Sequence, residues 1–208
     1  MIFDTNPQGS DAWLDARRGV CTASRFKDAL DVTKKGEPSS KCLGYALDLA
    51  RERCGGIVMP MYQNGAMRMG TEQEPFARMA YEGDTGRLVE EVGFAYTEDR
   101  KFGVSVDGLI DDDGIFECKT LVSSATLFQA VVDGDISEYR AQCIGALWLL
   151  GRKWVDLCLW APDLPRKLHP VRIARDDDEI EKLESGLMAF EKLVSGYEAK
   201  LRAKIALP

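Results

Sequence analysis

Three residues near the middle of the chain have the side chains that phosphodiester hydrolysis needs, namely Asp107, Glu117 and Lys119. Carboxylate oxygens hold hard divalent cations such as Mg²⁺. A cation held in this way activates a water molecule and stabilises the charge that develops on a phosphate. A nearby lysine can orient the nucleophile or stabilise the transition state. Because Glu117 and Lys119 are two residues apart, on a strand they would project from the same face.

The acidic-x-Lys spacing alone does not establish a nuclease site. A chain of this composition contains about two such triplets by chance, and further examples occur at 99–101 and 198–200. Only the triplet at Glu117 lies in an apolar run, where charged groups are costly unless they are paired or bind a metal. The alternative interpretation is a Glu117–Lys119 salt bridge on a solvated sheet face. The spacing leaves both interpretations open.

The elements that would position these residues are predicted from periodicity, capping and turn signals. Strands are expected over 93–97, 104–110, 115–121 and 154–160, and helices near 11–17, from 22–24, over 39–53, 70–82 and 138–150, and between Ile180 and Leu201. The last helix is amphipathic, and we expect its apolar stripe to pack on the core. The pattern predicts an α/β fold with a central mixed β-sheet flanked by helices, in a single domain spanning 1–208.

The turn between the two central strands decides whether Asp107 joins the other two residues. Asp111–Gly114 has strong turn residues. A simple four-residue loop would place Asp107 opposite Cys118, on the wrong face. We therefore predict a shift of one residue, through a five-residue loop or a bulge at Gly114, which would place Asp107 beside Lys119.

Composition excludes several classes of protein. The net charge of −7 argues against a protein that coats DNA with its whole surface, so DNA contacts should be confined to a local basic channel. No apolar run is long enough for a membrane helix, and the N-terminus lacks the features of a secretion signal, so we expect a cytoplasmic protein. The six cysteines have no zinc or redox spacing and are predicted to be small buried residues.

The single histidine, His169, precedes Pro170 and is predicted to lie in a surface turn. One isolated histidine makes a Ser-His-Asp hydrolase or a histidine-bound zinc enzyme an unfavourable interpretation.

Four blocks of sequence, taken in order, resemble the family of the bacteriophage lambda exonuclease and the YqaJ-like viral recombinases, which have a PD-(D/E)xK core. The blocks span about 11–163, and this ordered match is more specific than any one block. They are Trp13–Ser24, Gly70–Glu74, Ser105–Leu109 together with Glu117–Lys119, and Tyr139–Gln142 followed by Trp148. The core differs from the family pattern at Val106, where a proline is usual.

The resemblance implies a restriction-endonuclease-like core and a 5′-to-3′ exonuclease. Such an enzyme degrades one strand of linear double-stranded DNA from its ends and leaves a 3′ single-stranded overhang for recombination by annealing. The resemblance further implies two Mg²⁺ ions, which Mn²⁺ could replace, and a homotrimer that works beside a single-strand annealing protein. It places the protein in the cytoplasm of a bacterial host, as a phage or prophage product.

By position, the resemblance assigns metal binding to Asp107, Glu117, Glu74 and the carbonyl of Cys118, and a catalytic role to Lys119. It assigns contacts with the 5′-terminal phosphate and DNA to Trp13, Arg17, Ser24, Ser105 and Gln142.

Two of these assignments have structural alternatives. Pro75 disfavours helix at Glu74, which could then begin a helix in a capping box with Thr71. Arg17 could be an exposed helix charge beside Arg18.

Two other functions remain open at this point. An endonuclease with the same core, of the restriction or RecB type, would cleave closed circular DNA. A catalytically inactive DNA- or partner-binding module would not bind Mn²⁺.

Overall fold

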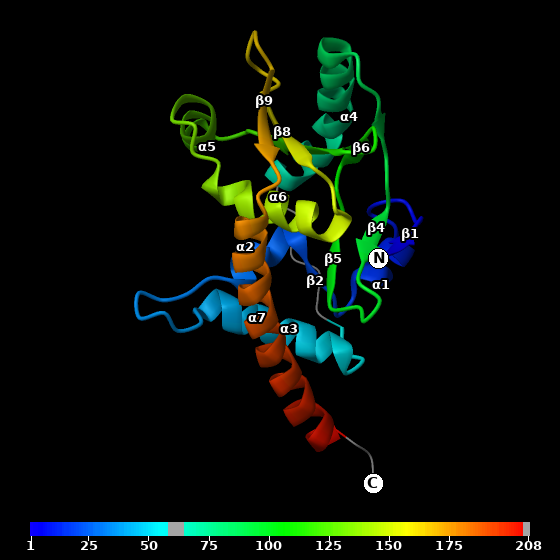
Figure 1. Cartoon of the computed structure of the whole chain (residues 1–208), viewed down its shortest axis with the longest axis vertical. Coiled ribbons are helices and arrows are strands. Elements are labelled where there is room, and N and C mark those ends of the chain that lie inside the picture. Colours follow the sequence, from blue (N-terminus) through cyan, green and yellow to red (C-terminus); the bar gives the residue numbers. More distant parts are fainter. Residues whose placement is uncertain (58–64, 206–208) are drawn as a thin grey trace. The chain divides into compact units, whose positions relative to one another are not determined.

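The computed structural model describes residues 1–57 and 65–205 (Figure 1). The chain forms two compact units made of interleaved segments. Among the described residues, the first unit contains 1–57, 93–105 and 176–205, and the second contains 65–92 and 106–175. Each unit has its own sheet, and that the whole chain forms one domain stays a prediction. None of the helices in the described ranges combines the length and the apolar character needed to cross a membrane.

The sheet of the first unit has the strand order β1-β4-β5-β2. Its strands are β1 (Ile2–Asp4), β2 (Cys21–Thr22), β4 (Phe94–Tyr96) and β5 (Phe102–Val104). β2 runs parallel to β5, while β4 is antiparallel to both β1 and β5. The carboxyl ends of β2 and β5 therefore lie at the same edge of this sheet.

The described residues of the first unit form four α-helices and one 3-10 turn. They are α1 (Asp11–Arg17), a 3-10 turn η1 (Ala23–Arg25), α2 (Phe26–Ala29), α3 (Ser40–Arg53) and α7 (Asp177–Ile205). The Ser10 side chain accepts from a backbone N–H in the first turn of α1, and that of Ser39, a predicted cap, accepts from two in the first turn of α3. The predicted cap at Thr22 makes no such bond. The apolar stripe of α7 is buried, and Phe190 stacks on Tyr45 of α3 with ring centroids 5.4 Å apart. This confirms that the stripe packs on the core.

The sheet of the second unit is mixed, as predicted, with the order β3-β6-β7-β8-β9. Its strands are β3 (Val89–Glu90), β6 (Gly108–Ile110), β7 (Gly114–Thr120), β8 (Trp154–Trp160) and β9 (Leu168–Ala174). β7 and β8 are parallel, and the other neighbours are antiparallel. The crossover from β7 to β8 contains α5 (Ser124–Leu127), a π-helical turn η2 (Phe128–Val132) and α6 (Ser137–Leu150).

One long helix of the second unit, α4 (Gly65–Thr85), packs against a face of this sheet. Tyr81 of α4 contacts the ring of Phe116 at 5.3 Å between centroids, and its hydroxyl donates to buried Asp156 at 2.6 Å. Arg172 forms a forked ion pair with the same carboxylate. The apolar cluster between helix and sheet contains Ala77, Tyr81, Val89, Ile110, Phe116, Cys118, Cys158, Trp160 and Leu168.

The prediction of one continuous strand over 104–110 is wrong. β5 ends at Val104 and β6 begins at Gly108, and these two strands belong to different sheets. The alternating pattern of buried residues, Val104, Val106 and Gly108, runs through the break without interruption. Periodicity reports which residues are buried, but it does not report which sheet buries them.

The prediction of a longer loop or a bulge at Gly114 is also wrong. Gly114 pairs with Ile110 inside the ladder, so the loop contains three residues, of which Asp111 has a positive φ of 47°. A Cβ at Gly114 would lie 2.2 Å from the ring of Trp154, so the glycine is required by packing in the strand. The register shifts in the opposite direction from the one predicted, yet it also places Asp107 and Glu117 on one face.

His169 does not lie in a surface turn, because it is inside β9 and pairs with Leu159 of β8. Pro170 beside it is tolerated because β9 is an edge strand. The cysteines are free thiols as predicted, and all are buried except Cys54, which is partly exposed.

Candidate active site

β7 places Glu117 and Lys119 on the same face of the second unit's sheet. Only 2% of Glu117 is exposed, and the Lys119 ammonium donates to its Oε1 atom at 2.8 Å. A salt bridge therefore exists, but its carboxylate is buried and only 27% of the Lys119 side chain is exposed, so the interpretation as a solvated sheet face is wrong. Two charged side chains in a central, apolar strand cost free energy that a structural role alone does not explain.

Asp107 lies one residue before β6, and the β6–β7 register, continued by one residue, places it opposite Glu117. Its Oδ2 atom accepts a hydrogen bond of 2.7 Å from the backbone N–H of Cys118. The Cys118 side chain points to the other face, into the apolar cluster, where burial raises its thiol pKa far above the ordinary range. On the face of the sheet that carries Asp107 and Glu117, Cys118 can therefore contribute only its main-chain groups.

Glu74 comes from the interior of α4. The helix begins at Gly65 and continues through Pro75 to Thr85, so the alternative of a helix start with a capping box at Thr71 is wrong. Burial, followed by the charge of Asp107, raises the pKa of Glu74 to about 7. The negative charge of Asp107 therefore disfavours ionisation of Glu74.

We call Asp107, Glu117, Glu74 and Lys119 the acidic cluster; it contains three carboxylates and one ammonium group. Burial and then the charge of Asp107 raise the pKa of Glu117 to about 8, and burial also raises the pKa of Asp107. Burial alone would lower the pKa of Lys119, but Glu117 and Asp107 raise it above its usual value, so Lys119 stays protonated. Ionisation of all three acids would leave an excess of negative charge in a buried region.

This donor set fits a hard divalent cation, which prefers carboxylate and carbonyl oxygens and would neutralise the excess charge. Among the described residues, no group of three or more His, Cys, Asp or Glu side chains is already arranged to hold a metal ion. The assignment of Asp107, Glu117, Glu74 and Cys118 to metal therefore stays a prediction, supported by donor chemistry and charge.

Gln142 of α6 also reaches the acidic cluster. Its Nε2 atom donates to Glu117 Oε1, the same oxygen that accepts from Lys119. Sequence reasoning missed this contact, because nothing in the pattern signals an approach between residues so far apart in the chain. The 5′-phosphate role that the resemblance assigned to Gln142 stays a prediction.

A second cluster lies in the first unit and contains Trp13, Arg17 and Ser105. Arg17 donates to the Ser105 hydroxyl at 2.8 Å, and its guanidinium lies 4.2 Å from the Trp13 ring centroid and 5.2 Å from that of Phe94. Burial lowers the pKa of Arg17 to about 10, which leaves the side chain cationic at neutral pH. Arg17 is thus held in place, and the interpretation as an exposed helix charge is wrong.

Ser24 lies in η1, two residues beyond the end of β2, and Ser105 directly follows β5. Because β2 and β5 are parallel, both serines lie at the same sheet edge. Ser24 is exposed, and its hydroxyl is 3.4 Å from that of Thr22. The first unit therefore places a guanidinium and two hydroxyls, all good phosphate partners, around one edge.

Comparison with known proteins identifies the family and the fold of the chain. Residues 12–153 match the model of the YqaJ-like viral recombinase domain. No curated protein matches the chain. The chain is 32% identical to LHK-Exo, an alkaline exonuclease from Laribacter hongkongensis, with a TM-score of 0.83, covering 95% of this chain and 98% of that one. The same values hold for LHK-Exo solved in complex with dAMP.

A phage-related exonuclease from Haemophilus somnus 129PT shares the fold at 15% identity, with a TM-score of 0.71 and coverage of 88% of this chain and 96% of that one. The matched family domain contains the acidic cluster and the arginine cluster alike. The chain belongs to the YqaJ-like viral recombinase family, and it is a DNA-binding nuclease.

Proposed function

We propose that the protein is a divalent-metal-dependent exonuclease that degrades the 5′-ended strand of linear duplex DNA and leaves a 3′ single-stranded overhang. The observation that carries this proposal is the grouping of Asp107, Glu117 and Lys119 on one face of the second unit's sheet, where the charge of Asp107 also acts on Glu74. Likeness to the alkaline exonuclease LHK-Exo over nearly the whole chain supports it.

In this proposal Asp107, Glu117, Glu74 and the Cys118 carbonyl hold two Mg²⁺ ions, which Mn²⁺ can replace. When bound, these ions supply an activated water and stabilise negative charge on the phosphate. Lys119 remains protonated beside Glu117 and stabilises the charge that develops on the scissile phosphate. The N–H of Cys118 keeps the Asp107 carboxylate in place.

Trp13, Arg17, Ser24 and Ser105 recognise the 5′-terminal phosphate in this proposal. Within the described part of the chain, the Trp13 indole N–H is buried without a hydrogen-bond acceptor, so a phosphate oxygen would satisfy it. Only Val106 separates Ser105 from Asp107 in the sequence. The complex of LHK-Exo with dAMP supports a site for a nucleoside monophosphate, the product that removal of one terminal nucleotide would release.

Family membership supports three further parts of the proposal. The protein acts as a homotrimer on double-stranded DNA ends, works beside a single-strand annealing protein in recombination, and is a phage or prophage product in the cytoplasm of a bacterial host.

Digestion of end-labelled linear duplex tests this function. With Mg²⁺, we expect a 5′ label to be released as mononucleotide in the first cycles, while a 3′ label stays on strands that become shorter. EDTA should stop the digestion of both labelled substrates. Asp107→Ala and Lys119→Ala should each lower the rate on the order of 100-fold or more, as removal of a transition-state partner does. Circular dichroism checks that the variants are folded.

Three outcomes would contradict the proposal. Cleavage of closed circular DNA would indicate an endonuclease with the same core. Undiminished digestion in EDTA would exclude metal dependence. Absence of hydrolysis together with absence of Mn²⁺ binding in calorimetry would indicate an inactive binding module.

A further inference from the structure

The turn between α1 and β2 connects Arg17 to the segment that carries Ser24. Gly19, at its centre, has a φ of +73°, and a Cβ on it would lie 2.9 Å from Cγ of Arg53. The turn is closed by a hydrogen bond of 3.1 Å from the Val20 N–H to the Arg17 carbonyl. Its conformation therefore sets the direction in which the end of α1 presents Arg17.

Two consecutive residues at the end of α3 hold both polar backbone groups of Gly19. The Glu52 carboxylate accepts from the Gly19 N–H at 2.8 Å, and Arg53 Nε donates to the Gly19 carbonyl at 2.8 Å. Side chains from one helix thus fix a turn that lies 33 or 34 residues earlier in the chain.

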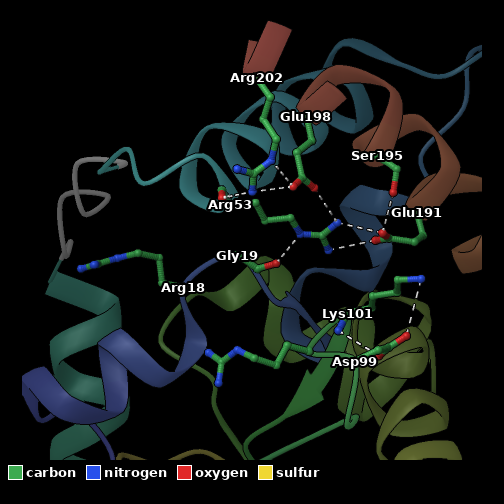
Figure 2. Close-up of a pocket in the computed structure, with 10 residues that line it drawn as sticks. Arg18, Gly19, Arg53, Asp99, Lys101, Glu191, Ser195, Glu198 and Arg202 are labelled. Carbon is green, nitrogen blue, oxygen red and sulfur yellow. Dashed lines mark hydrogen bonds and ion pairs between the residues drawn. The ribbon is translucent and has the colours of Figure 1, made fainter. Parts of the chain in front are cut away.

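Arg53 is itself fixed by α7, as Figure 2 shows. Its two terminal nitrogens donate to the two oxygens of Glu191 at 2.8 and 2.9 Å. Glu191 is 4% exposed and also accepts from the Ser195 hydroxyl at 3.0 Å. A forked, buried ion pair of this kind is both strong and directional, so the Arg53 side chain has little freedom to move.

α3 also holds the chain on the other side of the turn. The Tyr45 hydroxyl accepts from the Thr22 N–H at 3.0 Å, and the Tyr45 ring lies 3.7 Å below the guanidinium of Arg25. The segment between Arg17 and Ser24 is therefore attached to α3 at two points, Gly19 and Thr22.

The cavity beside these contacts, of about 360 Å³, is lined largely by charged groups that are already paired. Besides the Arg53–Glu191 pair, Lys101 lies 3.6 Å from Asp99, and Arg202 lies 2.8 Å from Glu198 (Figure 2). These paired groups therefore connect α3, α7 and the Gly19 turn to one another.

We propose that Glu52 and Arg53 are positioning residues for recognition of the 5′-terminal phosphate. They hold the Gly19 turn and thereby set Arg17 and Ser24 at the spacing that a phosphate requires. This inference rests on the proposed phosphate role of Arg17 and Ser24.

The test compares initial rates on linear duplexes with and without a 5′ phosphate. The wild type should prefer the phosphorylated end, and Arg17→Ala should abolish the preference. Because a misplacement of about 1 Å can cost on the order of 100-fold, we expect Glu52→Ala to lower the ratio of the two rates by about tenfold. Glu52→Gln keeps an acceptor for the Gly19 N–H and should restore the ratio. Glu181→Ala, an exposed residue of α7, is the matched control.

A second variant tests Arg53. It combines Arg53→Met with Glu191→Gln, so that no buried charge is left without its partner. It too should lower the ratio. If Arg17→Ala loses the preference while both variants retain it, the positioning role is refuted and the phosphate pocket stands. If the wild type shows no preference, the phosphate pocket itself is refuted. If the Glu52 and Arg53 variants have a lower melting temperature but an unchanged ratio of the two rates, Glu52 and Arg53 contribute only to stability.

Discussion

The Glu117 carboxylate is held by two side chains. Its Oε1 atom accepts hydrogen bonds from Lys119 and Gln142 at once, so two donors from β7 and α6 fix the orientation of one carboxylate. Residues that orient a metal-binding carboxylate influence metal affinity without touching the ion. We therefore propose for Gln142 a role at the carboxylate that differs from a contact with the DNA end.

Replacement of Gln142 distinguishes the two roles. We expect Gln142→Ala to weaken Mn²⁺ binding by about 10- to 100-fold, the usual effect of losing an orienting partner, and to leave the preference for 5′-phosphorylated ends intact. Calorimetry measures the affinity, with Gln129→Ala as the control at an exposed glutamine. Unchanged Mn²⁺ affinity together with a lost phosphate preference would return Gln142 to the phosphate pocket.

The residues with chemical roles were largely predictable as a set, but their contacts were not. Asp107, Glu117 and Lys119 stand out because charges in an apolar strand need a reason. The Gln142–Glu117 contact and the Arg53–Glu191 pair join residues 25 and 138 positions apart. Local patterns hold no information about such approaches, which depend on tertiary packing.

The elements of the fold were predictable where their signals are local. α1, α3, α6 and β8 match their predicted ranges to within one residue, because capping serines, glycine ends and long apolar periods mark them. β1 was missed because it is three residues long and mostly exposed, and β9 because Pro170 lies inside it. The change of sheet between β5 and β6 was missed because burial alternates through it.

The hairpin of β6 and β7 sets the position of Asp107, and Gly114 is tightly packed against Trp154 within it. We expect Gly114→Ala to lower the free energy of unfolding by about 1–3 kcal/mol, because the added methyl group collides with Trp154. Nuclease activity should fall as well, since the hairpin register places Asp107 opposite Glu117. Urea unfolding followed by circular dichroism measures the stability.

Gly196→Ala is the matched control, because Gly196 lies in exposed helix with open space around its Cα. That change should raise stability by up to about 1 kcal/mol, since alanine is the better helix former. Equal effects of the two substitutions would show that the packing of Gly114 against Trp154 does not constrain the hairpin.

For the molecule as a whole, the acidic composition and the binding of DNA are compatible. A net charge of −7 includes the carboxylates of the cluster, and the divalent cations that we propose would reverse the local sign where the scissile phosphate would lie. In the proposed function, the arginine and hydroxyl groups at the edge of the other sheet would supply a separate, local site for phosphate. The proposed function thus confines contacts with DNA to two small regions, one in each unit.

The most direct test of the account is the position of bound metal. In crystals of the protein soaked with Mn²⁺, anomalous scattering should show an ion within about 2.5 Å of carboxylate oxygens of Asp107 and Glu117, and the peak should disappear in Asp107→Ala. An ion bound elsewhere, or an empty cluster in protein that still digests DNA, would contradict the claim that these carboxylates form the active site.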